Sequence, residues 1–421
     1  MKHCIKMMTQ PVFGWFSLLP IVLLMIHRSP VEAGGAAAIV GGLMGASTVW
    51  SRTLRALLPL SAVPSALGWG VSTWVVASWV PKPWFVVAFP LAMIFATLPL
   101  RLAGAPRFIS NPLARTQESW LLVVHTARFG GDLVTTATLA TASASVGLAF
   151  DGQLLAAAAG ATFVVTMLAL GGVSLWRAIR AAHRGRKVRV AAVVVDGKPR
   201  ATGTSDGLWP AESPEYRDIR GTLERYRPHI EHAVSERASL VVLPEVSVYV
   251  ENEDARAQWL AGVETLAREL DVVMVAPFFD GCTPKNTLVV VDRNGIVGSY
   301  DKQYPARGLE PSCPKKMEVG PYSPCSGIPV STAICVDLDH PDIARSARMA
   351  RSLLAAPSND WFDGFEVIHH RSAVWTAVIG GVPIVRATGH GISSIYDSAG
   401  RVLMHRTSAA GPVVLVGDIY V

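Results

Sequence analysis

Long apolar runs fill the chain up to about residue 187, and short apolar segments separated by charges, prolines and turn residues fill the rest. A helix that crosses a bilayer needs about 20 predominantly apolar residues. The span 34–50 is rich in Gly and Ala, so we expect it to pack closely against neighbouring helices. The change in pattern predicts a membrane domain over residues 1–187 and a second domain over residues 188–421. The apolar runs predict about six transmembrane helices, at 11–26, 34–50, 58–80, 83–100, 132–150 and 153–176.

The first apolar run has two interpretations. Lys2 and Lys6 precede it, and Val31–Ala33 resembles the small-residue site at which a signal peptide is cleaved. His27 and Pro30 lie between the run and that site and fit cleavage poorly. We therefore expect a retained helix.

Two opposite charges stand at the start of the span 132–150. Arg128 and Asp132 are four residues apart, a spacing that places two side chains on one helix face. The two residues either mark the edge of the membrane or form a polar site within it.

After residue 188 the periodicity is that of an α/β domain. The residues Asp292–Gly295 are a strong hairpin signal. Short apolar segments predict strands at 190–195, 240–243, 272–276, 287–291, 296–300 and 328–334. Helical spacing predicts helices at 214–236, 254–270 and 341–351, and the segments 353–356, 366–379, 383–387 and 393–396 continue the alternation.

The composition agrees with a membrane component. Half of the 421 residues are hydrophobic and 17% are charged, which is unusual for a soluble enzyme. Many of the basic residues behind the formal charge of +6 stand at the ends of apolar runs, as juxtamembrane residues do. No basic stripe with interleaved aromatic residues is present, so nucleic acid is not an expected partner.

The cysteines and histidines give no sign of a metal site. Five cysteines are too few for a disulfide scaffold in a chain of this length. Without a CxxC pair or histidines at zinc spacing, we expect neither a metal nor another cofactor. Cys313 and Cys325 either form a disulfide in an oxidising compartment or stay unpaired.

Three polar residues follow predicted strands, at the position where open α/β sheets place their sites. They are Glu245, Lys302 and Cys335. A thiol becomes a good nucleophile when a base takes its proton or a cation stabilises the thiolate. Glu245 is the candidate base, and Lys302 the candidate cation for the thiolate and the later oxyanion, with the backbone N–H of Val336 as a second oxyanion donor. Each residue taken alone also has an ordinary interpretation, as a buried small side chain or a loop charge.

The motifs around these residues resemble the nitrilase, or carbon–nitrogen hydrolase, superfamily. Leu243–Glu245, Tyr300–Lys302 and Ala333–Asp337 occur in the order of that family's Glu-Lys-Cys catalytic triad. The resemblance implies an αββα sandwich over residues 188–421 and a thioester intermediate on the cysteine. It also implies that Glu310 is a second active-site glutamate, whereas the ordinary interpretation is a loop carboxylate.

A nitrilase-like domain that follows membrane helices is similar in architecture to apolipoprotein N-acyltransferase. Ser358–Phe362 resembles a further block of that family, which implies that Asn359 and Trp361 bind substrate. The family has Tyr and Glu after the nucleophile where this chain has Val336 and Asp337. Asp337 is therefore either a shorter active-site carboxylate or a structural residue.

The resemblance implies that an acyl chain passes from a phospholipid, through a cysteine thioester, to the N-terminal amine of a lipoprotein. Phospholipid and lipoprotein are then the expected partners. One alternative is a membrane-tethered amidase or nitrilase-like hydrolase with the same triad. Another is a nitrilase-domain membrane protein of a plasmid conjugal-transfer system.

We expect a multi-pass protein of the bacterial inner membrane. Arginine clusters fall on alternate connections between the spans, and with six spans the positive-inside rule places residues 188–421 in the cytoplasm. The N-acyltransferase family places this domain outside. The side of the membrane therefore stays open.

Overall fold

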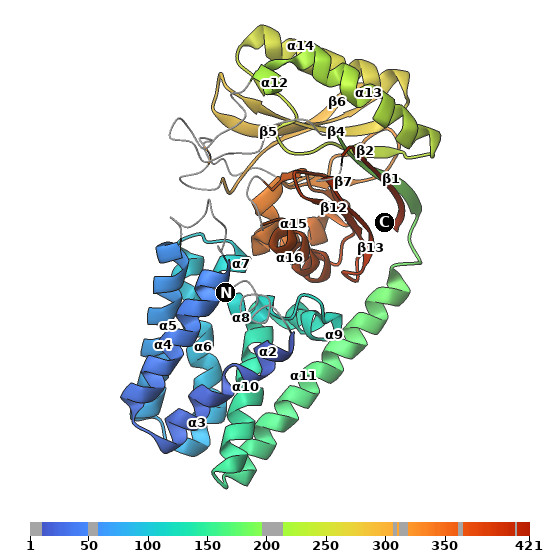
Figure 1. The fold of residues 1–421 in the computed structure, drawn as a ribbon. Helices are drawn as coiled ribbons and strands as arrows, with labels where there is room; N and C mark the ends of the chain where they lie inside the picture. Colours follow the sequence, from blue (N-terminus) through green and yellow to red (C-terminus); the bar gives the residue numbers. More distant parts are fainter. Residues whose placement is uncertain are drawn as a thin grey trace. The chain divides into compact units, whose positions relative to one another are not determined.

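The computed structural model describes residues 11–48, 58–195, 214–305, 310, 319–360, 365–408 and 411–421. The chain divides into two compact units, Met1–Arg177 and Ala178–Val421, and the division falls within the long helix α11 (Leu154–Ala181). Among the described residues the first unit consists of helices and the second contains the sheets (Figure 1).

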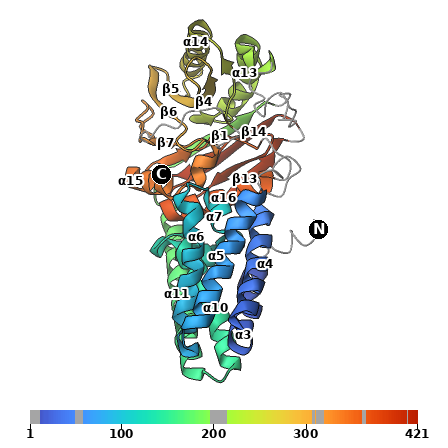
Figure 2. The same cartoon turned by 90° about the vertical axis from the view of Figure 1, so that its left-hand side faces the viewer.

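In the first unit, α4 packs along α5, α5 along α6, and α6 along α10 (Figure 2). Glycines permit the first of these contacts: a Cβ on Gly41 or Gly45 would lie 2.7 or 2.5 Å from the carbonyl oxygens of Ser65 and Ser61. Small residues thus let the helix backbones approach closely, as the sequence predicts. The elements are α2 (Pro11–Phe16), α3 (Leu19–His27), α4 (Pro30–Thr48), α5 (Leu58–Trp79), η2 (Lys82–Trp84), α6 (Phe85–Leu102), α7 (Arg107–Ser110), α8 (Pro112–Arg115), α9 (Leu121–Val124), η3 (His125–Phe129), α10 (Asp132–Phe150) and α11.

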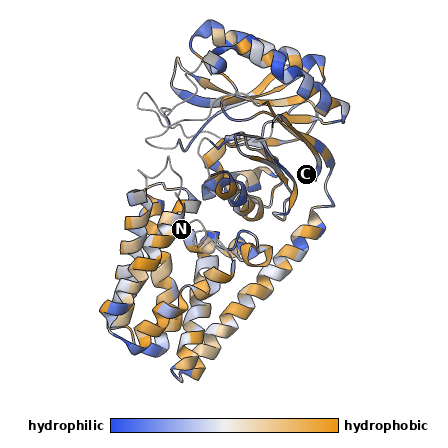
Figure 3. Ribbon diagram, in the orientation of Figure 1, coloured by the Kyte–Doolittle hydropathy of each residue, from blue (hydrophilic) through white to orange (hydrophobic). Residues whose placement is uncertain are grey.

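Three helices within the described ranges are long and apolar enough to cross a membrane. They are Lys82–Leu102, Asp132–Phe150 and Leu154–Ala181, with mean hydropathies of 2.0, 1.5 and 2.0. Figure 3 shows the apolar residues along them. The predicted span 11–26 is divided between α2 and α3, while 34–50 and 58–80 correspond to α4 and α5. The count of six spans therefore stays a prediction.

Arg128 and Asp132 lie on different helices, because η3 ends before a turn at Gly131 (φ 73°) and α10 begins at Asp132. The expectation that they share one helix face is therefore wrong. The buried Asp132 carboxylate accepts hydrogen bonds from Arg101 and from Asn111, the latter at 2.7 Å. Asp132 thus belongs to a polar cluster inside the first unit.

The second unit is built on two main β-sheets. The seven-stranded sheet has the order β14-β1-β2-β4-β5-β6 with β3 beside β4, and the five-stranded sheet has the order β13-β12-β10-β8-β7. A short parallel pair, β9 with β11, completes the strands of the described ranges. The strands are β1 (Lys187–Val194), β2 (Leu240–Val242), β3 (Tyr249–Val250), β4 (Val273–Asp280), β5 (Lys285–Asp292), β6 (Gly295–Asp301), β7 (Val330–Thr332), β8 (Leu353–Ala355), β9 (Ser358–Asn359), β10 (Ile384–Arg386), β11 (Thr388–Gly389), β12 (Ile392–Tyr396), β13 (Val402–Thr407) and β14 (Val413–Tyr420).

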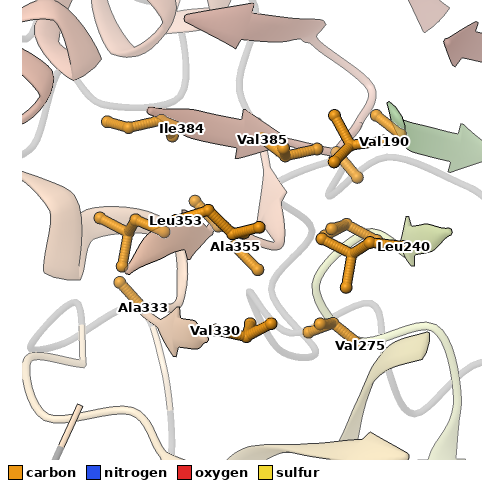
Figure 4. Packing of buried hydrophobic residues seen from close by; sticks show 14 of the residues in the cluster. Val190, Leu240, Val275, Val330, Ala333, Leu353, Ala355, Ile384 and Val385 are labelled. Atoms are coloured by element: carbon orange, nitrogen blue, oxygen red, sulfur yellow. The ribbon is translucent and has the colours of Figure 1, made fainter. Parts of the chain in front are cut away.

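The main core lies between the two sheets, because alternate residues of each strand point to the same face. In β1, Val190 and Ala192 belong to this inter-sheet core, whereas Ala191 and Val193 join the cluster under the helices. Figure 4 shows the inter-sheet packing of Val190, Leu240, Val275, Val330, Leu353 and Val385. Full burial of such side chains contributes about 1.5–3 kcal/mol each.

Helices cover the outer faces of both sheets. Ile230 of α13 and Trp259 of α14 pack on the seven-stranded sheet, and Ala377 of α16 packs with residues of the five-stranded sheet. The predicted αββα sandwich is therefore confirmed. The helices are α12 (Pro214–Arg217), α13 (Ile219–Ser235), α14 (Glu253–Glu269), η5 (Cys335–Asp339), α15 (Pro341–Ala350) and α16 (Phe365–Gly380).

The sequence patterns locate most of these elements to within a few residues but miss the last two strands. Every residue of β13 is exposed, so this strand has no apolar and polar alternation to detect. β14 pairs with β1 in antiparallel register from Val413 opposite Val194 to Tyr420 opposite Lys187. This pairing joins segments more than 200 residues apart and makes β14 an edge strand of the seven-stranded sheet.

Candidate active site

The three candidate catalytic residues each stand just beyond the C-terminal end of a strand. Glu245 follows β2, Lys302 follows β6, and Cys335 follows β7. Their exposed fractions are 1%, 3% and 7%. Because β2 and β6 belong to one sheet and β7 to the other, the sandwich itself brings the three segments together.

The Lys302 ammonium lies between two carboxylates. Its Nζ donates hydrogen bonds to Glu245 Oε1 and to Glu310 Oε2, both at 2.7 Å. Glu310 is therefore placed next to two of the residues of the sequence-derived triad. Burial opposes the charge on Lys302, but the two glutamates outweigh it and hold the pKa of Lys302 well above its usual value. Lys302 is thus a permanent cation at neutral pH.

A fourth residue of this cluster, Asn286, was not recognised in the sequence. Its Nδ2 donates to Glu245 Oε1 at 2.7 Å and to Glu310 Oε1 at 2.8 Å. One signal was present: Asn286 directly precedes the predicted strand 287–291 and shares a face with Leu288 and Val290, both in the inter-sheet core. A polar residue at a core position of a strand marks a candidate site.

The two oxygens of Glu245 have different surroundings. Oε1 receives both of the hydrogen bonds from Lys302 and Asn286. Oε2 is buried and has no hydrogen-bond partner among the described residues. A carboxylate oxygen that no donor occupies is available to accept a proton, so Oε2 can serve as a general base.

The Cys335 backbone adopts a conformation that is rare for a residue with a side chain. Its φ is 53°, in the left-handed region, and Val246, directly after Glu245, has a φ of 51°. Such positions are held only by surrounding structure and occur preferentially at functional sites. Here the Cys335 N–H donates to the Pro357 carbonyl at 2.7 Å, and its Sγ lies 3.7 Å from the carbonyl oxygen of Asn359.

Cys335 rests as a neutral thiol. Burial raises the pKa of this thiol well above its usual value, the charge on Glu245 raises it further, and Lys302 opposes the rise. Only the thiolate is strongly nucleophilic. For Cys335 to act as a nucleophile, a base must therefore remove its proton as the sulfur attacks, and Glu245 Oε2, which has no partner within the described ranges, is the candidate.

Asp337 braces the segment that carries Cys335, the candidate nucleophile. Its Oδ2 accepts hydrogen bonds from the Tyr300 hydroxyl at 2.8 Å and from the Ile334 N–H at 3.1 Å, and its Oδ1 accepts from the Tyr304 N–H at 2.8 Å. These contacts favour the structural interpretation of this residue. Val336 lies directly after Cys335 in η5, the position at which the sequence predicts an oxyanion donor, and its role stays a prediction.

Asp337 also gives a pH prediction for stability. Burial raises its pKa from 3.8 to about 6, against the opposing charge of Lys302. A carboxyl group whose pKa is raised in the folded state stabilises the fold while it is protonated. For Asp337 this contribution is complete below the unfolded pKa of 3.8 and is lost as the pH rises through the folded pKa of about 6. Asp337→Asn should therefore flatten the change in melting temperature between pH 4 and pH 6, measured by thermal unfolding against the parent chain. Equal slopes for the two proteins would contradict this assignment.

Asn359 lies beside the site, and its Nδ2 donates to the Glu245 carbonyl oxygen at 3.3 Å. The buried Tyr216 is a second neighbour that the sequence did not reveal, since its hydroxyl is hydrogen bonded to the Asn359 side chain. Trp361, predicted to bind substrate, and Cys313, predicted to pair or stay free, lie outside the described residues. Cys325 is exposed and carries a free thiol.

Solved structures of similar fold include nitrilase-superfamily members. Nit3 of Saccharomyces cerevisiae, described as a member of branch 10 of the nitrilase superfamily, is 21% identical over 56% of this chain and 90% of its own, with a TM-score of 0.45. An amidase from Nesterenkonia sp. is 19% identical over 57% of this chain and 92% of its own, with a TM-score of 0.45. No curated protein matches the chain.

The family comparison covers the whole of the second unit's catalytic region. Residues 210–419 match the family described as carbon-nitrogen hydrolase. That range contains Glu245, Lys302, Glu310 and Cys335, so the family match and the buried cluster concern the same part of the molecule. Through this domain, the chain belongs to the carbon–nitrogen hydrolase superfamily.

Proposed function

We propose that this protein is a membrane-bound cysteine acyltransferase that moves an acyl chain from a phospholipid to the N-terminal amine of a lipoprotein. The observation that carries the proposal is the buried cluster of Glu245, Lys302 and Glu310 at a neutral thiol, in a chain that also has helices long enough to cross a membrane. Such a cluster suits acyl chemistry through a thioester.

In the first half-reaction, the Cys335 sulfur attacks the carbonyl carbon of the lipid ester while Glu245 Oε2 takes the thiol proton. The negative charge that develops on the carbonyl oxygen is stabilised by Lys302 and the Val336 N–H. The ester C–O bond then breaks, and Glu245 returns the proton to the departing lysophospholipid oxygen. The acyl group remains on sulfur as a thioester.

In the second half-reaction, an amine attacks the thioester carbonyl carbon. Glu245 takes a proton from the attacking nitrogen, an amide bond forms, and the C–S bond breaks. The sulfur recovers its proton from Glu245, so the site returns to its starting state. Glu245 acts as base and then acid in each half, which requires one oxygen free of fixed donors.

A lipid donor gives a physical reason for the membrane helices, because a water-soluble amide needs no membrane. The long helix α11 exposes large apolar side chains, including Leu155, Val165 and Trp176. Lipid-facing helix surfaces have this character, whereas soluble proteins expose few contiguous apolar residues. The similarity to apolipoprotein N-acyltransferase in motif order and architecture supports the same donor and acceptor.

Hydrolysis of an amide is the second candidate, favoured by the description of the matching family as carbon-nitrogen hydrolases. Water would then replace the amine in the second half-reaction, and the first leaving group would be ammonia or an amine. The same cluster would carry out these steps. The two functions differ in donor and acceptor, and both require a thioester.

A labelling experiment separates them. The purified full chain, in micelles with a phospholipid that carries an alkyne-tagged acyl chain, should acquire a label that hydroxylamine removes, and peptide mass spectrometry should place it on Cys335. Adding a diacylglyceryl lipopeptide with a free N-terminus should transfer the label to the peptide. Absence of lipid label together with amine release from simple amides would contradict the acyltransferase and support the amidase.

A further inference from the structure

The side-chain amide of Asn286 is the neutral counterpart of the Lys302 ammonium. Each of the two groups bridges the same pair of carboxylates, with contacts of 2.7–2.8 Å. Asn286 is 1% exposed and lies at the start of β5, while its carbonyl oxygen accepts the Lys302 backbone N–H at 2.8 Å. The strand therefore fixes both the Asn286 side chain and the backbone of Lys302.

The hydrogen bonds divide unequally between the two glutamates. Glu245 receives both donors on a single oxygen, Oε1. Glu310 receives them on different oxygens, Nδ2 of Asn286 on Oε1 and Nζ of Lys302 on Oε2. Glu310 thus has a fixed donor on each oxygen, whereas Glu245 retains an oxygen without one among the described residues.

We propose that Asn286 is a positioning residue that holds Glu245 so that Oε2 stays free to take the Cys335 proton. This inference rests on the proposed use of Cys335 as the nucleophile. With Lys302 as the only donor, the Glu245 carboxylate would be free to rotate about its terminal torsion, which has a broad energy profile. Two donors on Oε1 oppose that rotation.

The residue type at this position fits the role. A second cation would leave the two carboxylates fully neutralised and weaken the base, because nearby positive charge makes a carboxylate less willing to accept a proton. An aspartate would add a third carboxylate and would offer no donor. With an apolar residue at this position, Lys302 would be the one remaining side-chain donor of the pair that now contacts both glutamates. The amide supplies a donor without adding charge.

Alkylation of Cys335 by iodoacetamide tests this role without any acyl substrate. The rate is measured against pH on the purified full chain by mass spectrometry of the peptide that contains Cys335. For Asn286→Ala we expect the rate at pH 7 to fall roughly tenfold, because the carboxylate is free to rotate away from the thiol. We also expect the low-pH limb to move upward, because a carboxylate that loses a donor holds its proton more tightly. Other charged groups of the cluster, Lys302, Glu310 and Asp337, are unchanged in this variant.

The neighbour Thr287 provides a matched control. Thr287→Val also removes one buried side-chain hydrogen bond from β5, the bond to the Tyr300 carbonyl at 3.1 Å, and its side chain points to the other face of the strand. This variant should keep the parent rate and pH limb. Asn286→Ser, which retains a single donor, should lie between Asn286→Ala and the parent.

The outcomes separate this inference from the proposed function. A parent-like pH limb in Asn286→Ala, or equal rates for Asn286→Ala and Asn286→Ser, would show that Asn286 is only structural and would leave the acyltransferase proposal intact. If Asn286→Ala does not fold, the comparison of Asn286→Ser with Thr287→Val decides the question. A parent chain whose Cys335 is not alkylated at any pH would overturn the nucleophile, and with it both proposals.

Discussion

The Cys335→Ala variant is expected to form no acyl-enzyme and to lose turnover by at least about 10⁴-fold. The reason is chemical, because alanine has no atom that can attack a carbonyl carbon or hold an acyl group. The effect on folding should be small, since alanine fills nearly the volume of cysteine and the Cys335 N–H bond to Pro357 is made by the backbone. The measurement is the hydroxylamine-sensitive label from tagged phospholipid, together with release of amine from simple amides.

Cys325→Ala is the matched control for this experiment. Cys325 is an exposed free thiol in the same unit, so its removal deletes an accessible cysteine outside the buried cluster. This variant should label as the parent does. Label retained in Cys335→Ala but lost in Cys325→Ala would move the nucleophile to Cys325 and would refute the mechanism derived above.

The Lys302→Met variant is expected to destabilise the second unit by about 3–5 kcal/mol, the usual effect of removing one partner from a buried ion pair. Without the ammonium, the Glu245 and Glu310 carboxylates remain buried together with only Asn286 between them. The melting temperature of the second unit should fall by on the order of 10 °C, from the usual shift of about 2–4 °C per kcal/mol for a domain of this size. Activity should be lost as well, because the oxyanion loses its cation.

Two further variants distinguish the effect of an uncompensated buried charge on stability from the effect of lost side-chain packing. Lys285→Met removes a lysine of β5 that pairs with Asp301 at 3.2 Å in a more exposed setting, and it should cost less than about 1 kcal/mol. Adding Glu245→Gln and Glu310→Gln to Lys302→Met removes the uncompensated charges, so most of the lost stability should return while activity stays absent. A triple variant as unstable as Lys302→Met would show that the loss comes from packing.

Local patterns in the sequence determined much of this protein. Apolar runs of helical length and the alternation of short apolar segments are properties of consecutive residues, so they located most strands and helices and the αββα order. The same local signals placed Glu245, Lys302 and Cys335 after strands, and their motif order indicated the family. The prediction that Arg128 and Asp132 share a helix failed because a turn at Gly130–Gly131 separates η3 from α10. The turn is so short that the four-residue spacing of the two charges still matched that of a continuous helix.

Only the tertiary structure decided the geometry of the candidate site. The pairing of β14 with β1 and the meeting of β2, β6 and β7 join residues far apart in the chain, and no short-range pattern encodes them. The position of Asn286 between two glutamates, the free oxygen of Glu245 and the left-handed backbone of Cys335 all follow from that packing. The sequence by itself indicated Glu245, Lys302 and Cys335 as candidate catalytic groups, because residue type and motif order are local properties of the chain. The fold decided which oxygen is free and which donors fix it, because hydrogen-bond geometry exists only after distant segments meet.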